Sequence, residues 1–172
     1  DEAVLKNKTA LVAGYLCAER WDLLPEFPKY TEENEKEFEK SEKIIRKRFA
    51  LGHNPLLTHK ENGQILYVSS FALLKEYRSK GLGEKFFENS IAALVCSMKD
   101  IKKVVLLVDS EWETALKIYK KLGFSQLYKI EGFFPTIQKK EKSDGLILEA
   151  NANQFREIQF EETKNDLSGI KI

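Results

Sequence analysis

The six residues Arg-Ser-Lys-Gly-Leu-Gly at positions 78–83 constrain the fold of this chain more than any other segment. An apolar, strand-like run, residues 65–74, precedes them, and a helical pattern follows in which Phe87, Ile91, Leu94 and Met98 share one face. A glycine-rich turn between a strand and a helix lets backbone N–H groups point inward, and the helix N-terminus adds partial positive charge. Such a turn suits an anion, and a diphosphate best.

Three kinds of phosphate loop compete for this segment. A P-loop needs Lys-Ser or Lys-Thr after its last glycine, whereas Glu84 and Lys85 follow Gly83 here. A dinucleotide fingerprint needs three glycines and a downstream acid in a repeated βαβ frame, and the loop has two glycines. The third kind, an R/Q-x-x-G-x-G/A loop that grips the pyrophosphate of coenzyme A, has every required position filled. A plain surface turn is the alternative.

A second segment narrows the choice among these kinds of phosphate loop. The run Val104-Val105-Leu106-Leu107-Val108 reads as a buried strand, and a helical pattern follows it over residues 110–122. Ser110 with Glu113 is typical of a capping box, and Gly123 is typical of the residue that ends a helix. The order is therefore strand, loop, helix, strand, helix.

These two segments together resemble the signature of the GNAT superfamily of acetyltransferases. Its first motif, V-x-P-x-x-R/Q-x-x-G-x-G/A, corresponds to residues 73–83, and its second, A-x-x-x-Y-x-K-x-G-F, to Ala115, Tyr119, Lys121, Gly123 and Phe124. The resemblance covers residues 64–150 well. It implies an α/β fold with a mixed, mostly antiparallel sheet flanked by helices. It also implies an acyltransferase that moves an acetyl group from acetyl-CoA to a primary amine by direct transfer.

The composition of the chain restricts its size, its partners and its location. The chain has 172 residues, enough for one domain, and a formal net charge of +1, which gives no reason to expect nucleic acid or a membrane as partner. Two cysteines and no visible signal peptide predict a cytoplasmic protein. We expect no metal site, because His53 and His59 flank Pro55 in what reads as a surface loop.

The remaining elements follow from local patterns. Residues 3–5 and 10–16 read as a hairpin, Thr31 caps a charged helix that ends near Gly52, and residues 53–64 form a loop. The narrow apolar stripe of Phe38, Ile45 and Phe49 predicts that this helix lies on the surface. Two further strands are expected at residues 126–134 and 146–149, on either side of a loop.

The predicted domain organisation has one irregularity. We expect a GNAT domain at residues 1–150, without its first strand and helices and with a charged helical insertion at about 22–64. Residues 151–172 form an extension that resembles the opening strand of such a domain. Three explanations account for the missing first elements and the strand-like tail: a trimmed chain with an unrelated tail, a tandem protein cut after its first repeat, or a permuted order. The trimmed chain is the simplest of them.

The resemblance implies roles for particular residues. The backbone of Phe71, Ala72 and Leu73 would pair with the pantetheine arm and hold the acetyl oxygen, although these side chains also suit any buried strand. The loop residues would face the pyrophosphate; they are Arg78, which braces the loop, and Ser79, Lys80, Gly81, Leu82 and Gly83. Tyr119 would protonate the leaving thiolate as general acid, with a plain core tyrosine as the alternative.

Departures from the family pattern leave the general base open. Trp112 stands where an asparagine is common and Lys75 where a proline is common, so Trp112 is expected to cover the cofactor or line the substrate mouth. Leu107 occupies a position where one branch carries a base. Tyr67 is the remaining candidate for accepting the amine proton, which it would relay through water. Ser69 and Asp109 are weaker candidates for the same role.

Two branches of the family compete for the acceptor. Phe133 and Phe134 resemble the paired aromatics of protein N-terminal acetyltransferases, although both lack the hydroxyl, while the insertion is similar to that of arylalkylamine acetyltransferases. The apolar pocket expected from Phe133, Phe134, Trp112 and Tyr67 favours a small amine with a hydrophobic body over a peptide N-terminus. A non-catalytic acyl-CoA-binding sensor of the same fold is the alternative function, and a homodimer is left open.

Overall fold

The computed structural model describes residues 12–135 and 142–157. Within them, five strands form one sheet in the order β1-β2-β3-β5-β4. The β2–β3 pair is parallel and the other three pairs are antiparallel. The strands span Gly14–Trp21 (β1), Ile65–Leu73 (β2), Lys103–Asp109 (β3), Ser125–Phe134 (β4) and Ser143–Asn151 (β5). The predicted α/β class with a mixed, mostly antiparallel sheet is confirmed.

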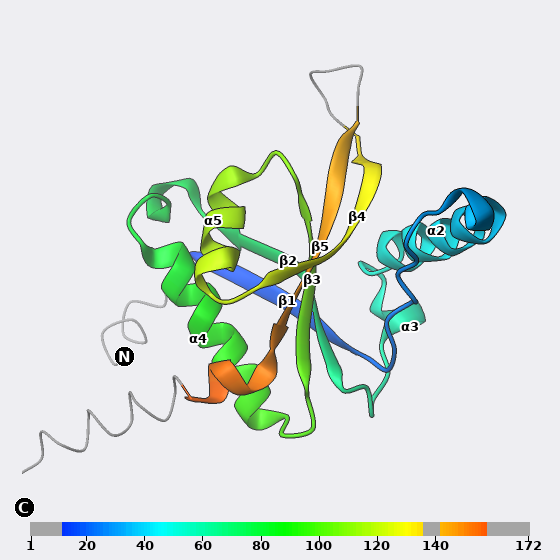
Figure 1. The fold of residues 1–172 in the computed structure, drawn as a ribbon. Coiled ribbons are helices and arrows are strands. Elements are labelled where there is room, and N and C mark those ends of the chain that lie inside the picture. Colours follow the sequence, from blue (N-terminus) through cyan, green and yellow to red (C-terminus); the bar gives the residue numbers. More distant parts are fainter. Residues whose placement is uncertain (1–11, 136–141, 158–172) are drawn as a thin grey trace, which may run out of the picture.

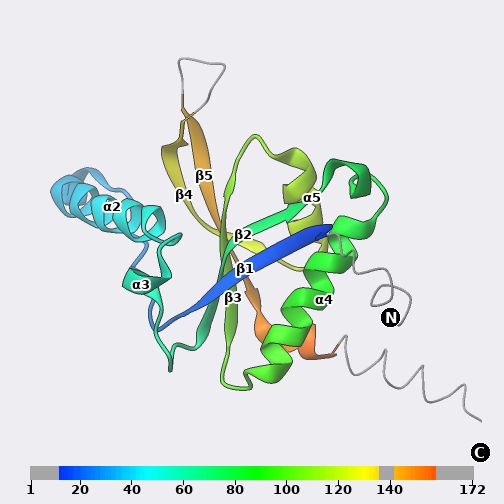
Figure 2. The same cartoon turned by 180° about the vertical axis from the view of Figure 1, so that it is seen from behind.

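Helices lie on both sides of the sheet. Figure 1 shows α4 and α5 on one side and α2 and α3 on the other, and Figure 2 shows the same arrangement from behind. The helices span Glu35–Ala50 (α2), Pro55–Thr58 (α3), Leu82–Ser97 (α4) and Glu113–Lys121 (α5), with short 3-10 turns at Glu32–Asn34 and Lys75–Tyr77.

Each face of the sheet has its own hydrophobic core, because successive side chains of a strand point to opposite faces. The core beneath α4 and α5 includes Leu66, Val68, Phe87, Ile91, Val95, Val104, Leu106 and Phe124. The core on the α2 and α3 side includes Trp21, Ile45, Phe49, Ile65, Tyr67, Val105, Ile130 and Ile147.

One extra residue interrupts this alternation in β2. Cys17 pairs with Ser70 but the next residue, Ala18, pairs with Val68, so Ser69 is a β-bulge. A bulge moves every later side chain of its strand to the opposite face. Val68 before the bulge and Phe71 after it therefore both pack into the core beneath α4 and α5.

Beyond the bulge, β2 and β3 separate. They pair only over residues 65–68 and 103–106, although β2 runs on to Leu73 and β3 to Asp109. On its other edge β2 remains paired with β1 as far as Leu73. In the described part of the chain, the backbone of residues 69–73 therefore has no partner strand on the side that faces β3.

The charged helix α2 packs more firmly than its narrow stripe predicted. Ile45 and Phe49 are fully buried against Trp21 and Tyr67, while Ile44 on the outer face is 54% exposed. The helix also begins later than expected, because a 3-10 turn follows Thr31, whose backbone N–H donates to the Asn34 side chain at 2.8 Å. The helix is thus a surface element with one buried stripe.

Other boundaries differ from those predicted. The expected loop at 53–64 contains α3, since Pro55 suits the first position of a helix and the Thr58 hydroxyl bonds the Asn54 carbonyl at 3.0 Å. Strand β5 starts at Ser143 rather than Leu146, because it pairs with β3 over its whole length. The first arm of the predicted hairpin and most of the predicted C-terminal extension lie outside the described residues, as do residues 136–141.

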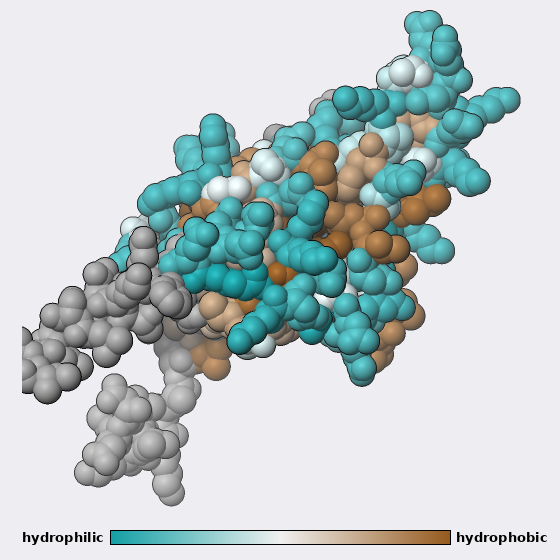
Figure 3. All heavy atoms as spheres, turned by 60° about the horizontal axis from the view of Figure 1, so that its bottom comes forward, coloured by the Kyte–Doolittle hydropathy of each residue, from teal (hydrophilic) through white to brown (hydrophobic). Residues whose placement is uncertain are grey.

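The surface mixes hydrophilic and hydrophobic side chains. Figure 3 shows hydrophobic atoms gathered between hydrophilic ones on the face it presents. Among the described residues, no helix has the length and apolar character that crossing a bilayer requires.

The packing of α2 predicts a contrast between two isoleucines of the same helix. Ile45→Ala should lower the free energy of unfolding by about 2–5 kcal/mol, because it leaves a cavity in a fully buried site. Ile44→Ala is the matched control and should change it by about 0.5 kcal/mol or less. Urea denaturation measures both, and equal effects would show that α2 does not pack on the sheet in this orientation.

Candidate active site

The glycine-rich loop joins the free end of β2 to the start of α4. Its backbone takes left-handed conformations at Ser79 (φ 58°) and Gly81 (φ 72°), and α4 begins at Leu82. The first N–H groups of a helix have no acceptor inside the helix. No side chain in the described part of the chain caps this helix N-terminus. The loop thus presents N–H donors and the positive end of a helix dipole to an anion.

Arg78 ties the loop to the strand before it. Its side-chain Nε donates to the carbonyl oxygen of Leu73, the last residue of β2, at 2.8 Å. This contact suits the bracing role expected of Arg78, and its role toward a cofactor stays a prediction. It holds the loop at the end where β2 and β3 separate.

The two glycines of the loop differ in what surrounds them. A Cβ added to Gly81 would meet no heavy atom of the described residues within 4 Å, so this side of the loop is open. A Cβ added to Gly83 would lie 3.4 Å from Leu73 Cδ1, which is ordinary contact. The described residues therefore leave the loop unobstructed beside Gly81.

An ion pair joins the two helices near this loop. Lys121 Nζ, at the end of α5, lies 2.5 Å from Glu84 Oε1 in the first turn of α4. The hydrogen bond to Glu84 raises the pKa of Lys121. Because Lys121 compensates its charge, Glu84 opposes an anion at the helix N-terminus less than a lone carboxylate would.

Tyr119 lies on α5 against the same core. Its ring centroid is 5.2 Å from that of Phe87, whose own ring is 5.3 Å from Phe71 in β2. Burial raises the pKa of Tyr119 to about 12. The phenol therefore stays protonated at neutral pH, and this is the state that a general acid requires.

The start of α5 differs from the predicted capping box. The helix begins at Glu113, with Trp112 as its first flanking residue and no side-chain cap from the residues that the structure describes. Ser110 does not cap it, because Trp112 and not Ser110 holds the N-cap position. The Ser110 N–H donates to the Asp144 carbonyl of β5 at 2.9 Å. Asp109 accepts from the Glu111 N–H instead, at 2.9 Å. Trp112 is 62% exposed at this corner.

Asp109 is engaged by its own neighbours. Besides the Glu111 N–H, its carboxylate accepts from the Ser143 hydroxyl at 2.8 Å. These contacts fix the end of β3 to the start of β5. The geometry gives Asp109 a structural role and does not favour it as general base.

The two predicted acceptor-site phenylalanines end β4. The rings of Phe133 and Phe134 meet edge to face at 5.0 Å, and Phe133 packs on the core shared with Tyr67. The neighbouring Gly132 adopts a φ of 53°, and its N–H donates to Asp144 at 2.8 Å. That hydrogen bond lowers the pKa of Asp144. Because Phe133 packs on the α2-side core and Tyr119 on the core beneath α4 and α5, the two residues lie on opposite faces of the sheet.

Tyr67 is buried in the α2-side core. Its ring stacks on Trp21 at 3.9 Å, and only 1% of its surface is exposed. Burial, and next the charge of Glu19, raise the pKa of Tyr67 far above its ordinary value, although Arg48 opposes this. The phenol therefore cannot act as an anionic base at neutral pH, but it can still relay a proton.

A buried carboxylate beside Tyr67 was not predicted from the sequence. Glu19 in β1 is 5% exposed and pairs in register with Tyr67. Both of its oxygens lie within 2.8 Å of the Thr58 hydroxyl. A single acid in a strand-like run is the only signal of it in the sequence, and such acids usually face solvent.

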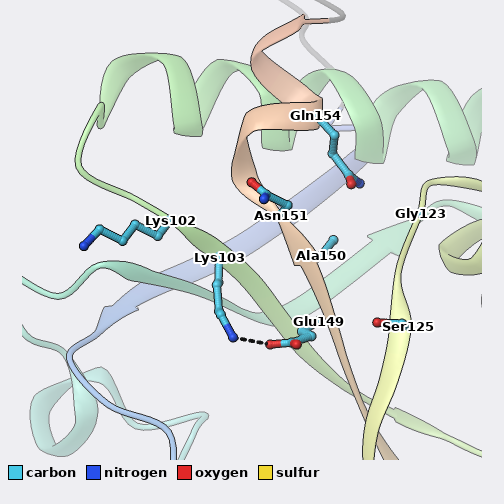
Figure 4. A pocket seen from close by; sticks show the side chains of 8 residues that line it. All are labelled: Lys102, Lys103, Gly123, Ser125, Glu149, Ala150, Asn151 and Gln154. Carbon is cyan, nitrogen blue, oxygen red and sulfur yellow. Dashed lines mark hydrogen bonds and ion pairs between the residues drawn. The ribbon is translucent and has the colours of Figure 1, made fainter.

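The structure also has a hollow far from this region. About 430 Å³ in volume, it lies where β3 begins and β5 ends, and Figure 4 shows its lining. In it, Lys103 Nζ pairs with Glu149 at 2.8 Å. The β2–β3 separation begins at the other end of these strands, so this hollow lies apart from the glycine-rich loop.

The predicted site residues thus divide between the two faces of the sheet. Residues 71–73, the loop 78–83 and Tyr119 gather on the α4 and α5 side, around the separated end of β2. Tyr67 and Phe133 belong to the opposite core, and Trp112 is exposed at the α5 corner. No group of three metal-ligating side chains occurs among the residues that the structure describes.

Parts of the chain are similar to known proteins. A family model described as an acetyltransferase (GNAT) domain matches residues 26–134. Similar solved structures include the ribosomal-protein-S18-alanine N-acetyltransferase from Escherichia coli, with 20% identity, a TM-score of 0.47 and coverage of 55% of this chain and 57% of that one. Arabidopsis thaliana NAA60 in complex with acetyl-CoA has 18% identity, a TM-score of 0.45 and coverage of 52% and 49%.

The chain spans about half the length of the solved structures that it matches. The family model covers well over half of the chain and includes both motifs, the glycine-rich loop and the helix that carries Tyr119. The chain belongs to the GNAT family of acetyltransferase domains.

Proposed function

We propose that this protein is an N-acetyltransferase that moves an acetyl group from acetyl-CoA directly to a primary amine. The observation that carries the proposal is the separated end of β2, which leads through the glycine-rich loop into the N-terminus of α4. Unpaired strand backbone suits the amide groups of a pantetheine arm, and the loop suits its pyrophosphate. The residues present therefore fit acetyl-CoA.

Different parts of the chain would hold different parts of this ligand. The backbone of Phe71, Ala72 and Leu73 would pair with the arm and polarise the acetyl oxygen. The N–H groups of residues 79–83 would bind the phosphates, while Arg78 keeps the loop in position through Leu73. When bound, acetyl-CoA supplies a thioester, an acyl group activated toward amines.

Tyr119 would donate the proton that the leaving thiolate needs. Tyr119 lies on the same side of the sheet as the glycine-rich loop. Its ring contacts the ring of Phe87, which also contacts the ring of Phe71. A raised pKa of about 12 keeps the proton on the phenol until a strong base such as a thiolate forms beside it.

The acceptor would approach from the opposite face of the sheet. The cofactor loop, α4 and α5 occupy one side of the sheet. An amine would therefore have to reach the separated ends of β2 and β3 from the side of α2. That side offers Tyr67, Phe133 and Leu107, which are aromatic or apolar. These side chains favour a small amine with a hydrophobic body over a peptide N-terminus.

Two pairs of variants test the loop. Gly83→Asp should abolish measurable coenzyme A binding because its charge repels the phosphates, whereas Gly83→Asn, of equal size, should retain most of it. Gly81→Trp should block binding by filling the open side, whereas Gly81→Ala carries only the backbone strain of a positive φ, about 1–2 kcal/mol. Calorimetric titration with coenzyme A measures all four, and unchanged affinity in Gly83→Asp and Gly81→Trp would exclude the loop as the phosphate site.

Removal of one hydroxyl tests the general acid. Tyr119→Phe should lower turnover roughly ten- to a thousandfold, while affinity for coenzyme A changes little, because the ring still packs on Phe87. Tyr30→Phe, at an exposed tyrosine, is the control and should retain full turnover. Full activity of Tyr119→Phe would make Tyr119 a core residue only.

Release of free thiol from acetyl-CoA across a panel of acceptors tests the function itself. We expect release with small amines that carry an aromatic or aliphatic body, and weaker release with short peptides. Release with peptides alone would favour the N-terminal acetyltransferase branch. Thermal stabilisation by acetyl-CoA without thiol release on any acceptor would contradict the transferase and favour a sensor.

A further inference from the structure

Glu19 is an unusually buried acidic side chain. Its side chain is 5% exposed, and among the described residues no Lys, Arg or His lies within ion-pair distance of it. A carboxylate that leaves water normally has a cation or several donors as partners, because desolvation of a charge is costly. Acids buried in this way occur often at functional sites.

One hydroxyl accounts for the hydrogen bonds of this carboxylate within the described part of the chain. Thr58 Oγ1 lies 2.8 and 2.7 Å from the two oxygens of Glu19, and 3.0 Å from the Asn54 carbonyl. A hydroxyl has one proton to donate, whereas an ionised carboxylate has about four acceptor positions. Glu19 therefore keeps acceptor capacity that Thr58 does not use.

The position of Glu19 links it to the site. It stands opposite Tyr67 in the β1–β2 register, so that the two Cβ atoms are about 5 Å apart, and its charge acts on the Tyr67 phenol. Tyr67 itself is two residues before the Ser69 bulge, where β2 begins to leave β3. Both side chains lie on the face from which the amine would approach.

We propose that Glu19 is the proton acceptor for the amine, acting through the hydroxyl of Tyr67. This rests on the proposed function. Tyr67 would accept a proton from the substrate ammonium as it passes its own proton to Glu19, so that the phenol never becomes an anion. In the described residues Glu19 is hydrogen-bonded to Thr58 and not to Tyr67, and the relay requires the Tyr67–Glu19 hydrogen bond to form when the substrate binds, as catalytic hydrogen bonds often do.

The transfer then balances in atoms and charge. The neutral nitrogen attacks the thioester carbon, the N–C bond forms and the C–S bond breaks. The second nitrogen proton leaves to solvent, and the thiolate takes its proton from Tyr119. Glu19 returns the first proton to water, and Tyr119 regains its proton from water, so one proton is released for each ammonium that is acetylated.

Other candidates are weaker on geometry. Both oxygens of Asp109 are held by Ser143 and Glu111, at the end of β3. Neither histidine of the chain suits the role, since Nδ1 of His59 accepts from the Arg20 backbone N–H at 3.3 Å and His53 follows α2 in a turn.

Two acceptors of different basicity test the proposal. An alkylamine is almost fully protonated at pH 7 and needs a proton acceptor, whereas an arylamine is already neutral. Glu19→Gln keeps the size and the contact with Thr58 but cannot take a proton. It should lower kcat/KM about 100-fold or more with the alkylamine and less than about threefold with the arylamine.

A relay predicts further results. Tyr67→Phe should give the same selective loss, and the double variant should be no slower than either single one, because both act in one step. Glu149→Gln is the matched control and should leave both rates unchanged, because this strand carboxylate is paired with Lys103 and, in the described sheet, does not contact Tyr67's partner strand β1.

The outcomes separate the possible failures. Equal losses with both amines, or no loss with either, would overturn the role of Glu19 while leaving the transferase function intact. A wild-type protein that is inactive on every acceptor would overturn the proposed function.

If Glu19→Gln does not fold, the variants Thr58→Val and Thr58→Ser decide whether Glu19 is the proton acceptor. Loss of the hydroxyl in Thr58→Val should reduce the alkylamine rate alone, and Thr58→Ser should retain it; equal rates in the two would count against the proposal.

Discussion

The extra residue Ser69 in β2 is the feature on which the rest of the site depends. Backbone N–H and C=O groups in a sheet normally find partners on both sides, so an inner strand offers nothing to a ligand. The bulge ends the pairing of β2 with β3 after Val68, while β1 continues to hold the other edge. Unpaired backbone therefore becomes available inside an otherwise complete sheet, and it leads directly to the loop before α4.

Aromatic packing fixes this separated end. Because the bulge turns Phe71 toward α4, its ring meets Phe87 at 5.3 Å, and Phe87 in turn meets Tyr119 at 5.2 Å. Such ring pairs contribute about 0.5–1.5 kcal/mol each beyond the area they bury. The strand that would hold the acyl arm, the helix that begins at the phosphate loop and the proposed general acid are thus one packed unit. Within the loop, the left-handed conformation costs energy at Ser79 but not at Gly81, and the neighbouring Arg78 side chain donates to the Leu73 carbonyl.

The sequence was most informative where backbone geometry requires particular residues. Two glycines between an apolar run and a helical pattern predicted the loop, and Gly123 predicted the end of α5, where its φ is 76°. The bulge could not be predicted, since one inserted residue leaves no compositional mark, and without it the facing of Phe71 and Tyr67 cannot be derived. The capping box at Ser110 was wrong because α5 starts two residues later than the pattern predicted, after a turn in which Asp109 accepts from the Glu111 N–H. Glu19 was overlooked because its burial depends on Thr58, 39 residues away. The roles of the site residues stay predictions.

A crystal structure with coenzyme A bound is the most direct test of this account. We predict diphosphate oxygens within hydrogen-bond distance of the N–H groups of residues 79–83, and a pantetheine arm paired with the β2 backbone after Ser69, with its sulfur near the Tyr119 hydroxyl. A ligand bound at another surface, with the loop and the gap between β2 and β3 unchanged from the free protein, would contradict it.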